Sequence, residues 1–239
     1  MILLMEDGFM KYIARRNDFG QEQDLKEHLE NVAILAMKFA SHFDSSKIAY
    51  TIGLLHDIGK YSIAFQKRIN GSNEKVDHST AGLQLCEKTF DCFLARAMGY
   101  CISGHHGGLV NFGTEVDNGE LPTLNGRLKK NIEKYDAYQK EITISKDIDL
   151  EKIKSILCKS EMPDFSLSFY IRMLYSCLVD ADYLDSEAFM NPEIDRKIDY
   201  DYQIMNSKLN NYLNNFKNKK GIINEKRQEI LRKCIQCSY

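Results

Sequence analysis

The sequence predicts an all-α bundle with a long irregular loop and a helical C-terminal extension. Apolar residues recur at steps of three and four along most of the chain, as they do on the buried face of a helix. Alternating patterns are rare, and only residues 141–144 (EITI) suggest a strand. Hydrophobic residues make up 44% of the 239 positions, which suffices for a packed core. We expect one domain over residues 1–217 and a linker helix over residues 218–239.

The first half of the chain contains four predicted helices. The first has one apolar stripe, formed by Leu25, Leu29, Val32, Ala36, Phe39 and Phe43. Polar residues 44–46 can cap a second helix, which leads through an apolar stripe into His56 and Asp57. His78 stands at another helix start, followed by a helix of roughly ten residues. A helix near residues 91–103 leads into the glycines around His105 and His106, where the backbone must turn sharply.

The middle of the chain, residues 109 to about 162, is predicted to be a long irregular connection. Its turn-forming residues are Gly113, Asn118, Gly119, Pro122, Asn125 and Gly126. Loops of this length are uncommon in compact domains and often functional. Pro163 precedes a strong helical pattern over about residues 166–189, and a second stripe follows over residues 198–216. A short terminal helix is predicted from about Ile223.

Composition excludes several classes of protein. No apolar run approaches the roughly 20 residues that span a bilayer, and the start MILLMEDGFM is too short and too soon acidic for a secretion signal. The seven cysteines are interpreted as reduced core residues, and Cys234 and Cys237 lack the second pair that a zinc site requires. A net charge of −2 does not indicate a general nucleic-acid binder. We expect a cytoplasmic protein without a membrane partner.

Five of the six histidines form an ordered array with acidic residues. The array consists of His28, His56 with Asp57, His78, and His105 with His106, so that only His42 is left out. The helix after Pro163 adds an Asp-Ala-Asp segment at residues 180–182. Imidazole and carboxylate are the ligands that divalent transition metals favour. Taken alone, His28 would more often be a buried core residue, but the array as a whole predicts a polynuclear metal site and a hydrolytic reaction.

Asp57 is the predicted centre of this site. Adjacent residues of a helix diverge by about 100°, so His56 and Asp57 are expected to address two neighbouring ions. A bridging carboxylate with ions about 4 Å apart is the arrangement of a two-metal phosphodiesterase. Lys60, one turn after His56, can extend toward a phosphate, with a surface lysine as the alternative. Basic residues of the long loop are candidates for tracking a nucleic-acid backbone, with a solvated helix face as the alternative; they are Arg127, Lys129, Lys130 and Lys134.

These residues resemble the HD superfamily of metal-dependent phosphohydrolases, an all-helical fold. More narrowly, residues 54–60 (LLHDIGK), 77–79 (DHS) and 104–109 (GHHGGL) are similar to the HD nuclease domain of the CRISPR type I nuclease-helicase. Residues 172–185 (RMLYSCLVDADYLD) resemble the last motif of that nuclease, closest to the type I-C branch. The resemblance covers essentially the whole chain, and its histidine pattern and last motif are highly specific.

The resemblance implies an endonuclease and exonuclease that acts on single-stranded DNA and is recruited to the R-loop by the Cascade surveillance complex. It implies two metal ions, held by His28, His56, Asp57, His78, His105, His106 and Asp182. With five imidazoles, iron, manganese, cobalt or nickel is expected in preference to magnesium. Asp182 matches the Ala-Asp pair that supplies a ligand across the superfamily. Asp180 points about 200° away on the helix, so we expect it to support a ligand or to be structural.

The C-terminal residues 224–234 resemble the segment that leads into the helicase in those proteins, and no helicase phosphate loop is present. We therefore expect a helicase domain or subunit as a partner. Two alternatives remain. An HD phosphohydrolase of nucleotides, such as a dNTPase, a cyclic-nucleotide phosphodiesterase or an alarmone hydrolase, would use the same metal chemistry. A non-catalytic signalling domain is disfavoured, because decayed sites usually lose a ligand first.

Overall fold

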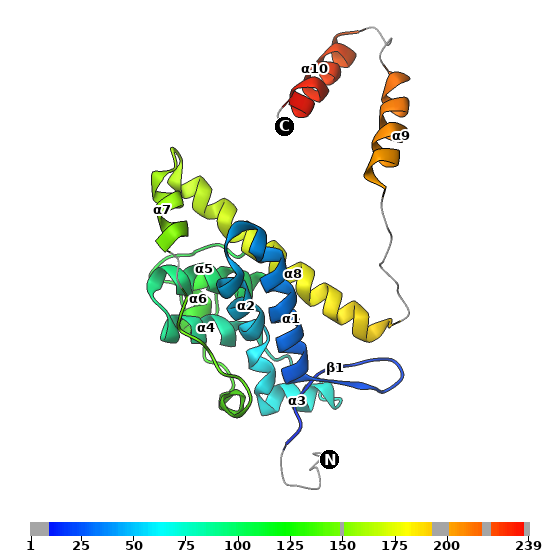
Figure 1. The fold of residues 1–239 in the computed structure, drawn as a ribbon. Helices are drawn as coiled ribbons and strands as arrows, with labels where there is room; N and C mark the ends of the chain where they lie inside the picture. The colour runs from blue at the N-terminus through cyan, green and yellow to red at the C-terminus, as the bar shows by residue number, and fades with distance from the viewer. Residues whose placement is uncertain (1–9, 149–150, 193–200, 217–220, 237–239) are drawn as a thin grey trace. The chain divides into compact units, whose positions relative to one another are not determined.

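The computed structural model describes residues 10–148, 151–192, 201–216 and 221–236 (Figure 1). The chain divides into two compact units, Met1–Glu193 and Ile194–Tyr239. The boundary predicted between residues 217 and 218 lies outside the described residues. The regular secondary structure of the described part is helical apart from one two-stranded sheet, so the predicted all-α class is confirmed. None of the described helices is both long enough and apolar enough to span a bilayer.

The first unit is a helical bundle with a short N-terminal hairpin. The hairpin pairs β1 (Ile13–Arg16) with β2 (Glu22–Asp24) in antiparallel orientation. Its longer helices are α1 (Leu25–Ala40), α2 (Ser46–Leu55), α4 (Ser79–Thr89), α5 (Cys92–Gly104), α7 (Glu151–Lys159) and α8 (Pro163–Met190). The shorter helical segments are η1 (Ser41–Phe43), η2 (Ile58–Tyr61), α3 (Ile63–Ile69), α6 (Leu124–Lys129) and η3 (Asp136–Lys140).

Helix α1 forms where the sequence predicts it and supplies one wall of the core. The side chain of Asp24 caps it by accepting a hydrogen bond from the Glu27 amide. Its predicted stripe is buried from Leu25 to Ala36, while Phe39 and Phe43 are partly buried against the core. This face packs against α2 and α8, and α8 also packs against α5, which in turn pairs with α4 (Figure 1).

The backbones of α1 and α2 approach each other unusually closely at Gly53. A Cβ atom added there would lie 2.5 Å from the Ala33 Cα and 2.7 Å from the Ala33 nitrogen. Only a glycine opposite a small residue permits this approach. It brings His28 of α1 beside His56, which follows the end of α2, with ring centroids 5.2 Å apart. Helix packing therefore unites two histidines that are distant in sequence.

Two predictions for the middle of the chain need correction. Residues 141–144 form no strand; in the described part of the chain, strands occur only at β1 and β2. Ile142 is buried and Thr143 is exposed, because an extended segment lies against the core without a neighbouring strand. The long connection is also more structured than predicted, since it contains α6, η3 and α7.

The predictions for the cysteines are partly correct. Among the described residues, Cys86, Cys101 and Cys177 are buried and free, as expected for reduced core cysteines. Three others, Cys92, Cys158 and Cys234, are free but exposed. Cys237, the partner of Cys234 in the CxxC pair, lies outside the described residues.

The second unit contains α9 (Tyr202–Asn214) and α10 (Ile222–Gln236). Asp201 caps α9 by accepting hydrogen bonds from the amides of Gln203 and Ile204. Helix α9 was predicted from an apolar stripe, whose first residue, Ile198, lies outside the described residues, and α10 was predicted as a short terminal helix from about Ile223. Their apolar side chains, such as Leu209 and Ile230, are exposed.

Candidate metal centre

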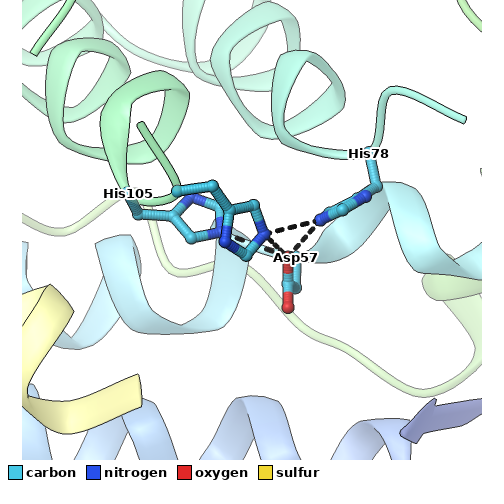
Figure 2. A group of neighbouring side chains, drawn as sticks. Asp57, His78 and His105 are labelled. Atoms are coloured by element: carbon cyan, nitrogen blue, oxygen red, sulfur yellow. Dashed lines mark hydrogen bonds and ion pairs between the residues drawn. The ribbon is translucent and has the colours of Figure 1, made fainter. Parts of the chain in front are cut away.

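The five histidines of the array and two of its acids meet at one place in the first unit. His28 lies in the first turn of α1, and Asp182 lies on α8. The other ligands stand where helices begin or end: His56 and Asp57 between α2 and η2, His78 before α4, and His105 and His106 after α5. Figure 2 shows Asp57, His78 and His105 pointing toward one another. His42, the histidine left out of the array, is exposed in η1.

One oxygen of Asp57 faces a group that we call the first site. Its Oδ2 lies 3.6 Å from His28 Nε2 and 3.3 Å from His56 Nε2. Asp182 Oδ1 closes this group, 3.6 Å from His28 Nε2 and 3.8 Å from His56 Nε2. The first site therefore offers two imidazole nitrogens and two carboxylate oxygens.

The other oxygen of Asp57 faces a different group, the second site. Its Oδ1 lies 3.3 Å from His78 Nε2, 3.4 Å from His105 Nε2 and 3.9 Å from His106 Nε2. The Nε2 atoms of His78 and His106 are 2.8 Å apart. The second site therefore offers three imidazole nitrogens and one carboxylate oxygen, and Asp57 belongs to both sites.

These separations, 2.8–3.9 Å, are close to those in the coordination sphere of a transition metal. Ligand atoms about 2.1 Å from one ion are separated by about 3.0–3.4 Å in octahedral or tetrahedral geometry. Among the described residues, the buried atoms His56 Nε2, His105 Nε2 and Asp57 Oδ1 have no hydrogen-bond partner. Buried polar atoms without a partner are rare in proteins and often mark the place of an ion. The residues present therefore fit two ions with Asp57 between them.

Hydrogen bonds behind the imidazoles turn the free ring nitrogens toward the centre. His56 Nδ1 donates to the Gly53 carbonyl at 2.7 Å, and His105 Nδ1 donates to the Ile102 carbonyl at 2.6 Å. His28 Nδ1 donates to Asp185 Oδ2 at 2.6 Å. With the proton on Nδ1, each Nε2 presents its lone pair to the centre.

Residues 25–140 match the HD domain among models of known protein families. The match supports the HD superfamily. It includes every histidine of the centre and Asp57, and it ends before α8, which carries Asp182. Together with the cluster of histidines and aspartates, the HD domain indicates a metal-dependent phosphohydrolase. No curated protein matches this chain significantly.

Asp185 is a residue of this candidate metal centre that the sequence prediction missed. It is buried, and its carboxylate accepts hydrogen bonds from Gln23 and Asn31 as well as from His28. Burial is the largest single influence and raises the pKa of Asp185, but the contacts with His28, Gln23 and Asn31 together outweigh it, so that the net pKa lies below its ordinary value. Its position one helical turn after Asp182 is the signal that could have identified it. Asp180, which was expected to support a ligand or be structural, is exposed on α8.

We predict that Asp185→Asn weakens the affinity of the first site for its ion by about 10–100-fold, the usual effect of losing the partner of a metal-bound histidine. The amide carries no charge to hold the Nδ1 proton of His28, so the ring loses basicity and its fixed orientation. Calorimetric titration with Mn²⁺ measures the effect. Asp180→Asn removes an exposed carboxylate from the same helix and should leave the affinity unchanged. Equal affinities for both variants would show that Asp185 does not support the centre.

Lys60 contacts the carboxylate at the middle of the candidate metal centre. Its Nζ lies 2.7 Å from Asp57 Oδ2 and donates to the Ala14 carbonyl at 3.2 Å. The side chain is only 9% exposed. Burial raises the pKa of Asp57, but the charges of Lys60 and His56 hold it well below its ordinary value. Asp57 is therefore ionised at neutral pH and available to cations. The predicted contact of Lys60 with a phosphate stays a prediction.

One edge of the second site, formed by His105, is buried, and the other, formed by His106, is accessible to solvent. The His105 side chain is fully buried, whereas that of His106 is 52% exposed. Burial lowers the pKa of His78, and burial together with the charge of His105 lowers the pKa of His106 to about 4. Both rings are thus neutral at pH 7, which leaves their Nε2 lone pairs able to bind an ion.

Most of the basic residues predicted to bind nucleic acid contact the protein itself. Arg127 donates to the Ser79 hydroxyl at 3.1 Å, and Lys130 pairs with Asp77 at 2.6 Å. Lys129 donates to the carbonyls of Glu115 and Asp117 in the same loop. Arg127 and Lys130 thus brace the segment that carries His78, while Lys134 is exposed.

Proposed function

We propose that the chain is a nuclease that cleaves single-stranded DNA by two-metal phosphodiester hydrolysis. The carrying observation is the position of Asp57, whose two oxygens face separate sets of ligands. Two bound ions would polarise the phosphodiester and activate the attacking water, and would stabilise the leaving oxygen. The imidazole-rich ligand set favours iron, manganese, cobalt or nickel over magnesium.

The chain's own residues have distinct roles in this proposal. Asp57 would hold the two ions together, and Lys60 keeps its carboxylate ionised. The hydrogen bonds of His28, His56 and His105 at Nδ1 fix the orientation of three ligands before substrate arrives. Such preorganised groups lower the barrier because they need not reorganise during the reaction.

The centre reaches the surface through His106 and Asp182, whose side chains are 52% and 19% exposed. An internal phosphate of a polymer must approach both ions from outside, which requires an open edge. A flexible single strand can present its backbone there more closely than a stiff duplex. These exposed ligands support a polymeric substrate.

The cellular role that we propose rests on the motifs. Residues 54–60, 104–109 and 172–185 resemble the nuclease of CRISPR type I interference. We propose that the chain acts in the cytoplasm with a helicase domain or subunit and is recruited by the Cascade complex. Processive degradation of duplex DNA would then depend on these partners, while cleavage of single strands by the chain alone would need no ATP.

A panel of metals with circular single-stranded DNA tests the proposed activity. The purified chain, stripped by a chelator and reloaded with Mn²⁺, Co²⁺, Ni²⁺, Fe²⁺ or Mg²⁺, should linearise and degrade the circles with a transition metal and act weakly with Mg²⁺. Gel electrophoresis follows the products. Intact duplex circles provide the matched control and should remain uncut.

The same preparations should be tested on dNTPs and cyclic nucleotides. Rapid hydrolysis of these small substrates, with single-stranded circles intact, would replace the nuclease proposal with a nucleotide phosphohydrolase. The metal ligands would be shared by both enzymes, so the substrate panel alone separates them.

A further inference from the structure

Arg15 of β1 extends into the first site. Its Nη2 lies 3.0 Å from His28 Nε2 and 3.3 Å from Asp182 Oδ1, and its Nη1 donates to the Ser186 hydroxyl. The side chain is 20% exposed, so the guanidinium lies at the rim of the centre. The hairpin places it there, because Arg15 pairs with Gln23 across the β1–β2 ladder, and Gln23 in turn donates to Asp185.

The contact with His28 carries a chemical constraint. His28 Nδ1 keeps its proton and donates a hydrogen bond to Asp185, so Nε2 carries no proton and offers a single lone pair. Arg15 Nη2 lies 3.0 Å from Nε2 and 3.2 Å from Nδ1, so it sits against the ring beside both nitrogens, and it lies 3.3 Å from Asp182 Oδ1. An ion in the first site would bind the Nε2 lone pair and Asp182 Oδ1. A guanidinium this close to both ligand atoms repels a cation there, so Arg15 must move aside when an ion binds.

Arg15 keeps its positive charge when an ion displaces it from His28. Arginine stays protonated in proteins, so displacement by an ion leaves a guanidinium beside the centre. Ser186 and the strand would keep it beside the first site. Planar guanidinium groups bind phosphate oxygens with two parallel hydrogen bonds. By contrast, the cation of Lys60 is buried against Asp57 and the Ala14 carbonyl.

We propose that Arg15 competes with the metal ion for His28 at the first site and, once displaced, binds the phosphate of the substrate. The competition depends only on the metal centre. The contact with substrate rests on the proposed phosphodiesterase function. Arg15 thereby couples loading of the first ion to formation of an anion-binding group at the rim.

Calorimetric titration with Mn²⁺ tests the competition without any measurement of activity. All variants carry His106→Ala, which removes a ligand of the second site and isolates the first. Arg15→Met should tighten the affinity of the first site by about tenfold, since a positive charge beside two of its ligand atoms no longer opposes the ion. Arg16→Met provides the matched control, because the neighbouring arginine pairs with Glu22 at 2.6 Å and should leave the affinity unchanged.

An unchanged or weaker Mn²⁺ affinity in Arg15→Met, with a melting temperature near that of the parent, would overturn the competition. Should Arg15→Met fail to fold, Arg15→Lys decides, because one ammonium group cannot reproduce the fork that contacts His28 and Asp182 through Nη2 and Ser186 through Nη1. Its affinity should lie between those of the parent and a tenfold gain.

The phosphate contact is tested in the protein with an intact second site. Arg15→Met at saturating Mn²⁺ should raise the KM for single-stranded DNA about tenfold. The control Arg16→Met should keep the parental KM. An unchanged KM would limit Arg15 to the metal step. Absence of nuclease activity in the parent would refute the proposed function, while the calorimetric result would still decide the competition.

Discussion

Asp57→Asn should abolish binding at both sites and lower cleavage of single-stranded DNA by at least about a thousandfold, because the lost ions supply several kcal/mol of transition-state stabilisation. Asp57 is 1% exposed, and each of its oxygens faces its own set of nitrogens. The amide preserves the shape of the side chain but removes the negative charge and replaces one acceptor oxygen with a donor. Calorimetry with Mn²⁺ and cleavage of circular DNA provide the two measurements.

The same substitution should destabilise the fold. Lys60 would remain buried beside a neutral amide, and an uncompensated buried charge costs about 3–5 kcal/mol. The double variant Asp57→Asn with Lys60→Met should recover much of this loss in urea denaturation without recovering ion binding. Ion binding by the double variant at parental affinity would show that Asp57 does not bridge the two sites.

Gly59→Ala should disrupt the second site selectively. A Cβ atom at residue 59 would lie 2.3 Å from the His78 carbonyl oxygen and 2.7 Å from the His78 Cα. These are backbone atoms at the start of α4, which cannot yield as a flexible side chain can. The segment must shift, at a cost of about 1–3 kcal/mol in the free energy of unfolding. His78 then moves away from Asp57, so we expect the second ion to be lost while the first is retained.

Mn²⁺ stoichiometry measures this effect, with a fall from two ions to one in Gly59→Ala. Gly107→Ala is the matched control, because a Cβ atom there meets nothing within 4 Å. It should retain both ions and the parental stability. Two ions of parental affinity in Gly59→Ala would show that the close contact with His78 does not set the geometry of the second site.

Much of this protein follows from local patterns in its sequence. The apolar stripes of α1 and α9 show which helix face is apolar, and the glycines after α5 show where the backbone turns. Both patterns depend only on residues that are close together in the sequence. The array of histidines with Asp57 was recognisable because imidazoles and carboxylates at such positions have a chemical use. The helical class and the residues that converge at the centre could therefore be predicted from the chain alone.

Other features depend on contacts between distant segments. The alternation at residues 141–144 predicted a strand, but burial of Ile142 against the helices satisfies the same pattern without a partner strand. The contacts of Lys60 and Lys130 with phosphate stay predictions, but the sequence did not reveal that the carboxylates of Asp57 and Asp77 pair with these cations within the protein. A side chain's charge is local information, whereas the group that neutralises it is supplied by the fold.

The residues that contact His28 show the same difference between local pattern and tertiary structure. The sequence by itself determined which residue types offer lone pairs to an ion. The packing of α1 against α8 places Asp185 where it accepts a hydrogen bond from His28 Nδ1. The β1–β2 hairpin places Arg15 beside the same ring, 3.0 Å from His28 Nε2. Residues 15, 28 and 185 have no periodic relation in the chain, so only the tertiary structure brings them within hydrogen-bond distance. Hydrogen bonds depend on separations of about 3 Å, which a one-dimensional pattern does not specify.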